Sequence, residues 1–561
     1  MKQYYILFMF ICLQTTSTAQ NTSPVSINID AAATGEPVKP IWAFFGYDEP
    51  NYTYMKDGKK LLSEIASFSK MPVYVRTHNL LTSGNGEAAL KWGSTNAYTE
   101  DSLGNPVYNW HITDSIFDTY ISRGMKPIAE IGFMPKALST HPHPYRHHWK
   151  PGVAYDSVYT GWAYPPTDYK KWGNLVYEWV KHCVQRYGET EVNSWYWEVW
   201  NEPNIGYWKG TPDEYYKLYD YAADAVKRAC PGTRIGGPTS TGPGWDKAES
   251  FLRNFLTHCA SETNAATGKT GAPLDYISFH AKGSPKFLNG HVRMNMATQL
   301  KDIIKGCNVV HNSSFKNLPI IIGECDPEGC AACGMATNPE NAYRNGTMYS
   351  SYTAASFSRI YDIAKLTGVT IEGAVSWSFE FENQPWFYGF RDLATNGVNK
   401  PVLNVFRMYA MMKGDRLSLT NTSTVAFDSV VNNSVHGSQR DLGAFATSDS
   451  KTTSVMIWNY HDDDLPAPSQ SMTLNFQNLP AKKVTVLLYK IDGDHSNAYE
   501  VWKKMGSPQQ VNDAQYKQLE AAGQLYNETI IKKQKITNGS YNMKVLLPAQ
   551  GVYLVRLLYE E

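Results

Sequence analysis

Eight short apolar runs, each followed by a segment of helical character, constrain the fold of this chain more than any other feature. In chain order they are WAFFGYDE, VYVRTHNLL, KPIAEIGFMP, WYWEVWNEP, RIGGPTS, LDYISFHAKG, IIIGECDP and EGAVSWSFEF. A strand that is apolar along its length must be buried on both faces, and alternation with helices implies parallel strands joined by helical crossovers. Eight such units within roughly 370 residues predict an α/β fold, a (β/α)8 TIM barrel over residues 41–414.

One of the predicted crossover helices has clear boundaries. Thr211 is suited to the N-cap, Pro212 to the first helical position, and Glu214 completes a capping box. The apolar stripe behind them consists of Tyr215, Leu218, Tyr219, Ala222 and Val226. This spacing places all five on one helical face that can pack against a sheet.

The pattern changes after about residue 415. The runs TSVMIWNY, KKVTVLLYKI and NMKVLLPAQGVYLVRLL are short, rich in β-formers and separated by polar turns. They predict an accessory antiparallel β-sandwich over residues 415–561. Near the N-terminus, Val25, Ile27 and Ile29 alternate with polar residues. We therefore expect residues 20–40 to contribute a strand that pairs with the sandwich.

Residues 1–19 have the order of a secretory signal peptide. Lys2 precedes an apolar run from Tyr4 to Leu13, and small and polar residues follow. The run is too short to span a bilayer, and no later segment is apolar enough. We expect an exported protein, periplasmic or secreted. A lipoprotein anchor at Cys12 is the less favoured alternative, because no clear lipobox precedes this cysteine.

Composition excludes one class of partner and is compatible with another. Lysine plus arginine and aspartate plus glutamate number 52 each, so there is no basic surplus for nucleic acid. Aromatic residues make up 13% of the chain, which suits stacking on sugar rings, although large cores account for most of them.

Seven cysteines remain after Cys12, which is no pattern for a disulfide scaffold. Cys325, Cys330 and Cys333 cluster in ECDPEGCAACG. A zinc site normally needs four ligands and no matching pair follows, so a local disulfide is favoured over a metal site.

Two glutamates end predicted barrel strands. Glu202 ends the fourth run and Glu324 ends the seventh. Solvated acids are common at strand ends, but the C-terminal ends of barrel strands converge on one mouth, so these two can face each other there. Two facing carboxylates suit the cleavage of a glycosidic bond.

The segment WNEPN is similar to the acid/base motif of clan A glycoside hydrolases, and the whole set of motifs resembles glycoside hydrolase family 39. The other segments that carry the resemblance are VRTHNLL, LDYISFHAKG, GECDPEG and, more weakly, YKIDGDHSNAYEVWKKMGSP in the C-terminal part. Within the family they are most similar to α-L-iduronidases and related to β-xylosidases. The resemblance implies a retaining double displacement on a glycoside, with no metal or cofactor.

Residue by residue, the resemblance implies that Glu202 is the acid/base and Glu324 the nucleophile. Asn201 would bind the hydroxyl beside the anomeric carbon, and His78 another ring hydroxyl unless it is a core histidine. Arg76 would support the site. Glu198, which shares the barrel face of Glu202 at a deeper level, is interpreted as structural support.

Lys282 bears most directly on the substrate. In the family's iduronidases, a lysine after the histidine equivalent to His280 helps hold the sugar carboxylate, and Arg391 resembles a second contact. We expect both residues and His280 to bind a terminal sugar of the uronic-acid type. The alternative for Lys282 is pairing with a local acid. The argument for a uronic acid is that a buried ammonium needs an anionic partner, which the substrate should supply if no protein acid does.

Two segments depart from the family pattern. SFEFEN offers Glu380 or Glu382 as the acidic sugar-binding residue, with Phe381 between them. The long loop HPHPYRHHWKPG holds four histidines but no acid or cysteine to complete a metal site, so we expect it to shape the substrate site. Trp149, with Trp162 and Tyr164, would form a stacking wall.

The sequence therefore predicts a retaining exo-glycosidase acting on a terminal uronic-acid-type sugar. A neutral β-D-xylosidase or related pentosidase uses the same two glutamates and is the main alternative. A non-catalytic barrel that binds glycans is the alternative from another class, and a metal-dependent hydrolase is the most distant.

Overall fold

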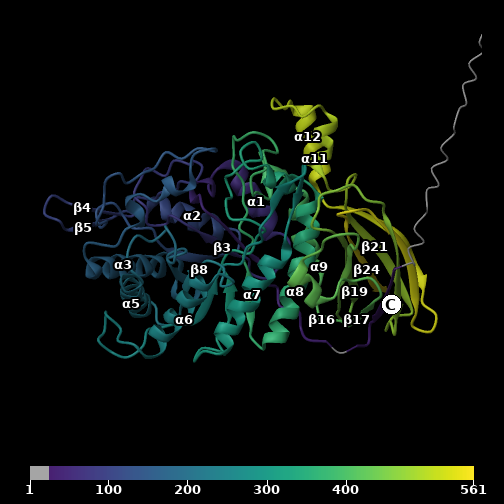
Figure 1. Cartoon of the computed structure of the whole chain (residues 1–561), viewed down its shortest axis with the longest axis horizontal. Helices are drawn as coiled ribbons and strands as arrows, with labels where there is room; N and C mark the ends of the chain where they lie inside the picture. Colours follow the sequence, from purple (N-terminus) through teal and green to yellow (C-terminus); the bar gives the residue numbers. More distant parts are fainter. Residues whose placement is uncertain (1–24, 34, 561) are drawn as a thin grey trace, which may run out of the picture.

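The computed structural model describes residues 25–33 and 35–560 (Figure 1). The predicted signal peptide at 1–19 lies outside the described residues. Within these residues, the helices are all too short or too polar to cross a membrane.

An eight-stranded parallel sheet forms the first half of the chain, in the order β13-β12-β9-β8-β7-β6-β3-β2. A parallel bridge between Phe45 and Ser376 joins its two edge strands and closes the barrel. Each of the eight predicted runs coincides with one strand, and only β13 begins one residue before its run. The strands are β2 (Phe44–Tyr47), β3 (Tyr74–Thr77), β6 (Lys126–Ile131), β7 (Tyr196–Val199), β8 (Arg234–Ser240), β9 (Tyr276–Phe279), β12 (Ile320–Ile322) and β13 (Ile371–Ala374). The predicted (β/α)8 barrel is confirmed.

A helix follows each strand of the barrel: α1 (Lys56–Ala66), α2 (His111–Ile121), α3 (Tyr169–Tyr187), α5 (Pro212–Ala229), α6 (Asp246–Ser261), α7 (Met296–His311), α8 (Thr347–Thr367) and α9 (Pro401–Met411). Helix α5 begins with the predicted capping box of Thr211 and Glu214. Its predicted apolar stripe is buried.

The loops after the strands carry further short elements at the C-terminal end of the barrel. They are the hairpins β4 (Tyr98–Glu100) with β5 (Pro106–Tyr108), β10 (Lys286–Leu288) with β11 (His291–Arg293), and β14 (Ala394–Thr395) with β15 (Val398–Asn399). The 3-10 turns η1 (Pro50–Tyr52), η2 (Tyr155–Val158), η3 (Gly161–Ala163) and η4 (Pro339–Asn345) lie in the same set of loops. Helix α4 (Glu189–Val192) precedes β7 at the other end.

The C-terminal part is a sandwich of two sheets, ordered β17-β1-β20-β23 and β16-β18-β19-β24-β21-β22. Their strands are β1 (Val25–Asp30), β16 (Asp415–Arg416), β17 (Leu419–Asn421), β18 (Asp441–Ser448), β19 (Thr452–Tyr460), β20 (Gln470–Gln477), β21 (Lys483–Ile491), β22 (Tyr526–Lys535), β23 (Tyr541–Leu547) and β24 (Val552–Glu560). Helix α10 (Phe427–Asn433) connects β17 to β18. One pair departs from the antiparallel pattern: β1 runs parallel to β20, which is possible because the N-terminal segment reaches the sheet without a hairpin.

Helices α8 and α9 lie between the barrel and the sandwich (Figure 1). Arg359 on α8 forms a buried ion pair with Asp441 on β18, at 2.8 Å. Ser351, also on α8, donates a hydrogen bond of 2.6 Å to Gln550 in the turn before β24. These buried polar contacts join the two parts through a specific interface.

The sandwich also reaches the barrel through an insertion between β21 and β22. Its helices, α11 (Ala498–Lys504) and α12 (Asp513–Gly523), project beyond the two sheets (Figure 1). Trp502 and Leu519 pack there against Phe387 and Val398, which lie in the loop after β13. That loop also carries Arg391, so the insertion supports one side of the barrel mouth.

Candidate active site

Glu202 lies three residues beyond β7, at the C-terminal end of the barrel. Its φ of 44° is in the left-handed region, an uncommon conformation for a residue with a side chain that often marks a functional position. The backbone N–H of Glu202 donates to the carbonyl of Thr239 on the neighbouring strand, at 3.0 Å. Its Oε1 atom is 2.8 Å from Nδ1 of His280, and the residue is 7% exposed.

Glu324 lies two residues beyond β12 and is 3% exposed. Its Oε2 atom is 2.6 Å from Nζ of Lys282 and 4.0 Å from Nη2 of Arg391. Its Oε1 atom is 3.7 Å from both Nη1 of Arg76 and Nε2 of His78. Nδ1 of His280 lies at the same distance of 3.7 Å from Oε1. Five nitrogen-bearing side chains thus surround one carboxylate.

Lys282 joins the two glutamates. Its Nζ is 3.6 Å from Oε1 of Glu202 and 2.6 Å from Oε2 of Glu324. The distance between these two oxygens cannot exceed the sum of the two contact distances. That limit is below the roughly 6.5 Å at which the carboxylate spacing of inverting glycosidases begins.

The same ammonium dominates the electrostatics of the pair. Burial alone would raise both pKa values, but the charge of Lys282 and the contacts with His280 outweigh it. They lower the pKa of Glu202 to about 2 and hold that of Glu324 below its ordinary value. Both groups are therefore carboxylates in the unliganded protein at neutral pH.

Arg76, on β3, organises the floor of the site. Its fully buried guanidinium contacts Glu198 at 2.5 Å and Glu130 at 2.7 Å. Its Nη2 also donates to Oδ1 of Asn201, at 3.1 Å. Because this oxygen is already bound, Asn201 is oriented by Arg76 and presents its amide nitrogen, which donates to none of the other residues in the described ranges.

His78 comes into the site but is surrounded by protein groups. Its Nδ1 lies 3.3 Å from Asp48, its Nε2 lies 3.3 Å from Glu130, and its ring packs 4.5 Å from that of Trp377. Burial lowers its pKa to about 3, so the ring is neutral. This environment favours the core-histidine alternative, with His78 supporting Glu324.

Sequence reasoning missed a wall of the site built from the first and second barrel strands. Asp48, directly after β2, forms a buried ion pair with Lys91 and accepts a 2.7 Å hydrogen bond from the indole of Trp377. Nζ of Lys91 also lies 5.1 Å above the ring of Tyr155. Asp48 lies at the end of the first apolar run, as Glu202 does at the end of the fourth, and that position was the available signal.

An aromatic cluster joins this wall to the third-strand loop. The hydroxyl groups of Tyr155 and Tyr207 are 2.5 Å apart, and Trp162 packs 5.7 Å from Tyr207. Of the three aromatic residues predicted to form a stacking wall, only Trp162 belongs to this cluster. Trp149 is buried and donates to Val153 within its own loop, and Tyr164 stacks on His141.

The two acids of SFEFEN have structural partners. Oε1 of Glu380 accepts from the backbone of Gly397, and Oε2 of Glu382 accepts from the backbone of Asp57 at the start of α1. Both contacts hold loops at the barrel mouth. The acid with an ion-pair contact to Arg391 is Glu324, at 4.0 Å. Asp326, two residues further along, is buried and accepts hydrogen bonds from Tyr349 and from the backbone of Trp377.

Arg391 is fully buried, yet its hydrogen-bonding capacity is not used up. Nη2 donates to the carbonyl of Gly329, at 3.1 Å. Nε and Nη1 are buried without a hydrogen-bond partner among the described residues. Buried donors of this kind need an explanation, and a ligand is one.

Two groups of residues carry side chains that could bind a metal ion. Asp48, His78 and Glu324 bring donor atoms within 4.8 Å of one another. Asp48 is paired with Lys91 and Glu324 with Lys282, so each carboxylate already has an ammonium group as its cationic partner. In the cysteine cluster, Cys330 and Cys333 form the predicted local disulfide, and Cys325 remains a buried free thiol.

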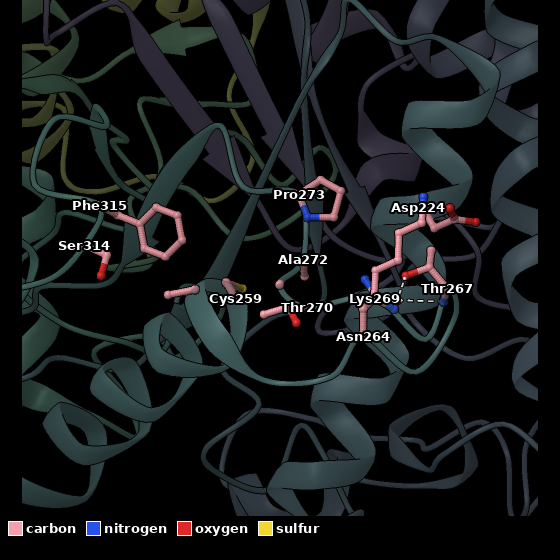
Figure 2. Close-up of a pocket in the computed structure, with 12 residues that line it drawn as sticks. Asp224, Cys259, Asn264, Thr267, Lys269, Thr270, Ala272, Pro273, Ser314 and Phe315 are labelled. Atoms are coloured by element: carbon pink, nitrogen blue, oxygen red, sulfur yellow. Dashed lines mark hydrogen bonds between the residues drawn. The ribbon is translucent and has the colours of Figure 1, made fainter.

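A separate cavity of about 550 Å3 lies at the N-terminal end of the barrel (Figure 2). It is lined by Cys259, Lys269, Phe315 and neighbouring residues from the loops that precede β9 and β12. The N-terminal end of a barrel serves stability in characterised enzymes, whereas chemistry lies at the opposite end. The glutamate pair, at that opposite end, is therefore the candidate active site.

A TIM barrel with a β-sandwich and two glutamates facing each other at its fourth and seventh strands has the architecture of a glycoside hydrolase. The chain belongs to glycosyl hydrolases family 39, whose family model matches residues 25–535.

Three similar proteins illustrate this relationship. A β-xylosidase of Caldicellulosiruptor saccharolyticus is 27% identical over 441 residues, which cover 76% of this chain and 78% of that protein. An α-L-iduronidase of Mus musculus is 22% identical over 540 residues, or 90% of this chain and 76% of its own length. The crystal structure of a monomeric β-xylosidase from Caulobacter crescentus CB15 matches with a TM-score of 0.74 and 21% identity, covering 96% of this chain and 100% of that one.

Proposed function

We propose that this family 39 enzyme is a retaining exo-glycosidase that removes a terminal sugar of the uronic-acid type, with Glu324 as nucleophile and Glu202 as acid/base. The observation that carries the proposal is the buried guanidinium of Arg391, whose Nε and Nη1 have no hydrogen-bond partner among the described residues. It lies beside Glu324, which Lys282 also contacts. The site thus combines two carboxylates for catalysis with two cations for a substrate anion.

The spacing of the carboxylates supports retention. A retaining enzyme needs its two carboxyl groups roughly 5 to 5.5 Å apart, so that one reaches the anomeric carbon directly. The shared contact with Lys282 keeps Glu202 and Glu324 below the inverting range. No room is then left between them for a nucleophilic water.

In the first step, Glu324 attacks the anomeric carbon and Glu202 protonates the leaving oxygen. The lowered pKa of Glu324 keeps the nucleophile ionised. The pKa of Glu202, about 2 in the unliganded protein, opposes its role as an acid. A substrate carboxylate that draws Lys282 away removes the main charge that lowers this pKa, so Glu202 can take up a proton.

In the second step, Glu202 accepts a proton from water, which attacks the glycosyl-enzyme and releases Glu324. Asn201 is oriented by Arg76 so that its amide nitrogen can donate to the hydroxyl beside the anomeric carbon. This hydrogen bond strengthens as oxocarbenium character develops.

The structure corrects one part of the sequence-based argument for a uronic acid. That argument held that Lys282 needs a substrate anion if no protein acid is its partner, but Glu324 is its partner at 2.6 Å. The case for an anionic substrate therefore depends on Arg391. Its Nε and Nη1 groups are buried without a partner among the described residues, next to the ammonium.

A β-D-xylosidase or related pentosidase is the second candidate. The observation in its favour is the pairing of Lys282 with both glutamates, which satisfies the ammonium without a substrate anion. The xylosidase relative also has higher sequence identity than the iduronidase relative, at 27% against 22%.

A panel of aryl glycosides tests the choice between them. We expect kcat/KM to be higher on aryl α-L-iduronides or β-D-glucuronides than on aryl β-D-xylosides. Higher kcat/KM on the xyloside, with little or no turnover of the uronides, would replace the first candidate with the second. No turnover of any member by the wild-type enzyme, with Glu202 and Glu324 intact, would contradict both.

A further inference from the structure

We propose that the Cys330–Cys333 disulfide loop positions Arg391 beside the nucleophile and so sets the enzyme's affinity for its substrate. The inference rests on the proposed function, because it takes Glu324 as the centre of the subsite. It adds a role for a loop that follows the nucleophile in sequence and belongs to none of the barrel strands.

The loop is compact and closed on itself. The two bonded cysteines are three residues apart. The backbone N–H of Cys330 donates to both carboxylate oxygens of Glu328, at 2.9 Å each. This turn starts only four residues after Glu324, so its conformation is coupled to the nucleophile through a short piece of chain.

The loop holds Arg391 at two points. The backbone N–H of Arg391 donates to the carbonyl of Ala331, at 2.9 Å. Its Nη2 donates to the carbonyl of Gly329, at 3.1 Å, and the same nitrogen is 4.0 Å from Oε2 of Glu324. The loop therefore fixes both the backbone and the charged end of this side chain.

Acidic groups attract the charged end of Arg391 but do not orient it by hydrogen bonds. The nearest of them, Oε2 of Glu324, is 4.0 Å away. Nε and Nη1 of Arg391 have no hydrogen-bond partner within the described part of the chain. Among the described residues, the carbonyl of Gly329 is thus the hydrogen-bond acceptor that orients the guanidinium. If the Gly329 carbonyl moves, the guanidinium loses the bond that orients it.

A second guanidinium, that of Arg344, also holds the loop. Nη1 of the buried Arg344 donates to the carbonyls of Cys330 and Cys333, at 3.0 and 3.3 Å, and Nη2 forms an ion pair with Glu328. These bonds need both cysteine carbonyls directed to one side. The disulfide enforces that arrangement by restricting the chain between the two cysteines.

The composition of the loop explains why the disulfide is needed. The segment GCAACG contains only small residues around the cysteines, and such chains lose much conformational entropy when they are ordered. A covalent cross-link removes part of this cost in advance. Without it, we expect the loop to populate several conformations and Arg391 to lose its fixed orientation.

The experiment combines the Cys330→Ser and Cys333→Ser substitutions. Both are changed together, because a single change leaves a lone thiol in the same segment as the free Cys325. Steady-state kinetics are measured on whichever aryl glycoside the wild-type enzyme cleaves best. We expect KM to rise roughly three- to tenfold with a smaller change in kcat. Cys230→Ser, a buried free cysteine on the far side of the barrel, is the matched control and should leave both constants unchanged.

A double-mutant cycle separates positioning from a general structural effect. Arg391→Ala alone should raise KM at least as much as loss of the disulfide. In the Arg391→Ala background, loss of the disulfide should add almost nothing, because the residue it positions is absent. Additive effects would overturn the proposal, as would an unchanged KM in the disulfide variant.

A second measurement applies if the serine variant does not fold. Wild-type enzyme is treated with dithiothreitol, which converts the disulfide to two thiols and is itself oxidised to a cyclic disulfide, while circular dichroism reports that the fold persists. The same rise in KM supports the proposal, and an unchanged KM with the thiols titrated as free overturns it. The result of the aryl glycoside panel does not affect this test, because KM of the variant and of wild type are compared on a single substrate of either class.

Discussion

Nζ of Lys282 lies 2.6 Å from Oε2 of Glu324. The same lysine side chain is 21% exposed, so it borders the space that a sugar would enter. One ammonium is therefore both the ion partner of the proposed nucleophile and a candidate ligand of the substrate. Several measurable consequences depend on this double position.

Replacement of Lys282 by methionine should shift the pH dependence of catalysis upward. Loss of the positive charge makes ionisation of Glu202 and Glu324 less favourable, so the pKa values of the coupled pair rise. Both limbs of the kcat/KM profile on an activated aryl glycoside should move to higher pH. Lys286→Met, an exposed lysine on the nearby hairpin, should leave the profile in place. A profile that shifts equally in both variants, or in neither, contradicts the role of Lys282.

The substrate preference of the same variant is a separate prediction. Loss of a charge-assisted contact typically costs about 1.5 to 3 kcal/mol, so Lys282→Met should lower kcat/KM on an aryl uronide roughly ten- to a hundredfold. An aryl xyloside should lose much less. Equal losses on the two substrates would show that Lys282 acts on the glutamates alone and does not hold a sugar carboxylate.

Glu202→Ala should slow substrates with poor leaving groups far more than activated aryl glycosides. Only the poor leaving groups need their oxygen protonated in the first step. Added azide should partly restore turnover of activated substrates, because the small anion can attack the glycosyl-enzyme without a general base. The comparison uses leaving groups of graded basicity. A slope of log kcat against leaving-group pKa that stays as shallow as in wild type would argue against proton donation by Glu202.

Retention of anomeric configuration should be visible in the first product. Two displacements at the same carbon restore the starting configuration, and Glu324 has the lowered pKa and the position needed for the first of them. NMR spectra recorded early in the reaction, before mutarotation, should show a product with the anomeric configuration of the substrate. An inverted product would exclude Glu324 as a nucleophile. Glu324→Gln should abolish turnover.

Glu49 should make stability depend on pH. Burial, followed by the adjacent charge of Asp48, raises its pKa to about 8 in the folded state, from an ordinary value of 4.5. Between these values the unfolded chain has released a proton that the folded chain still holds, so stability falls as pH rises from about 4.5 to about 8. Glu49→Gln imitates the neutral acid and removes this dependence.

Melting temperatures measured across that range provide the check on Glu49. Wild type and Glu49→Gln should melt at similar temperatures near pH 4.5, and the variant should be the more stable at pH 8. Glu36→Gln, at an exposed position, should follow wild type throughout. Parallel curves for wild type and Glu49→Gln would mean that Glu49 is ionised in the folded protein at all these pH values.

The sequence was sufficient for features that depend on neighbouring residues. Burial of a strand on both faces requires a continuous apolar run, so each of the eight runs could be recognised separately, and their number and alternation with helices predicted the barrel. The cap of α5 was visible for the same reason, since its partners Thr211 and Glu214 are three residues apart. The two glutamates were found because each ends one of these runs.

Contacts between distant residues could not be predicted in this way. Nothing near Lys282 in the sequence indicates that its partner is Glu324, and nothing near Asp48 indicates Lys91, 43 residues away. Glu380 and Glu382 have the residue type of a sugar ligand, and nothing near them in the sequence indicates that they also bind the backbones of Gly397 and Asp57. Oε2 of Glu380 has no hydrogen-bond partner among the described residues.

The sequence by itself thus determined the barrel, the sandwich and the positions of Glu202 and Glu324, because local hydrophobic pattern and strand ends specify these. Only the tertiary structure decided which charges meet at the barrel mouth. The eight loops that converge there come from positions as far apart as Asp48 and Arg391. The pKa values, the ion pairs and the free donors of the site depend on distances of a few ångströms between them, and no local pattern encodes those distances.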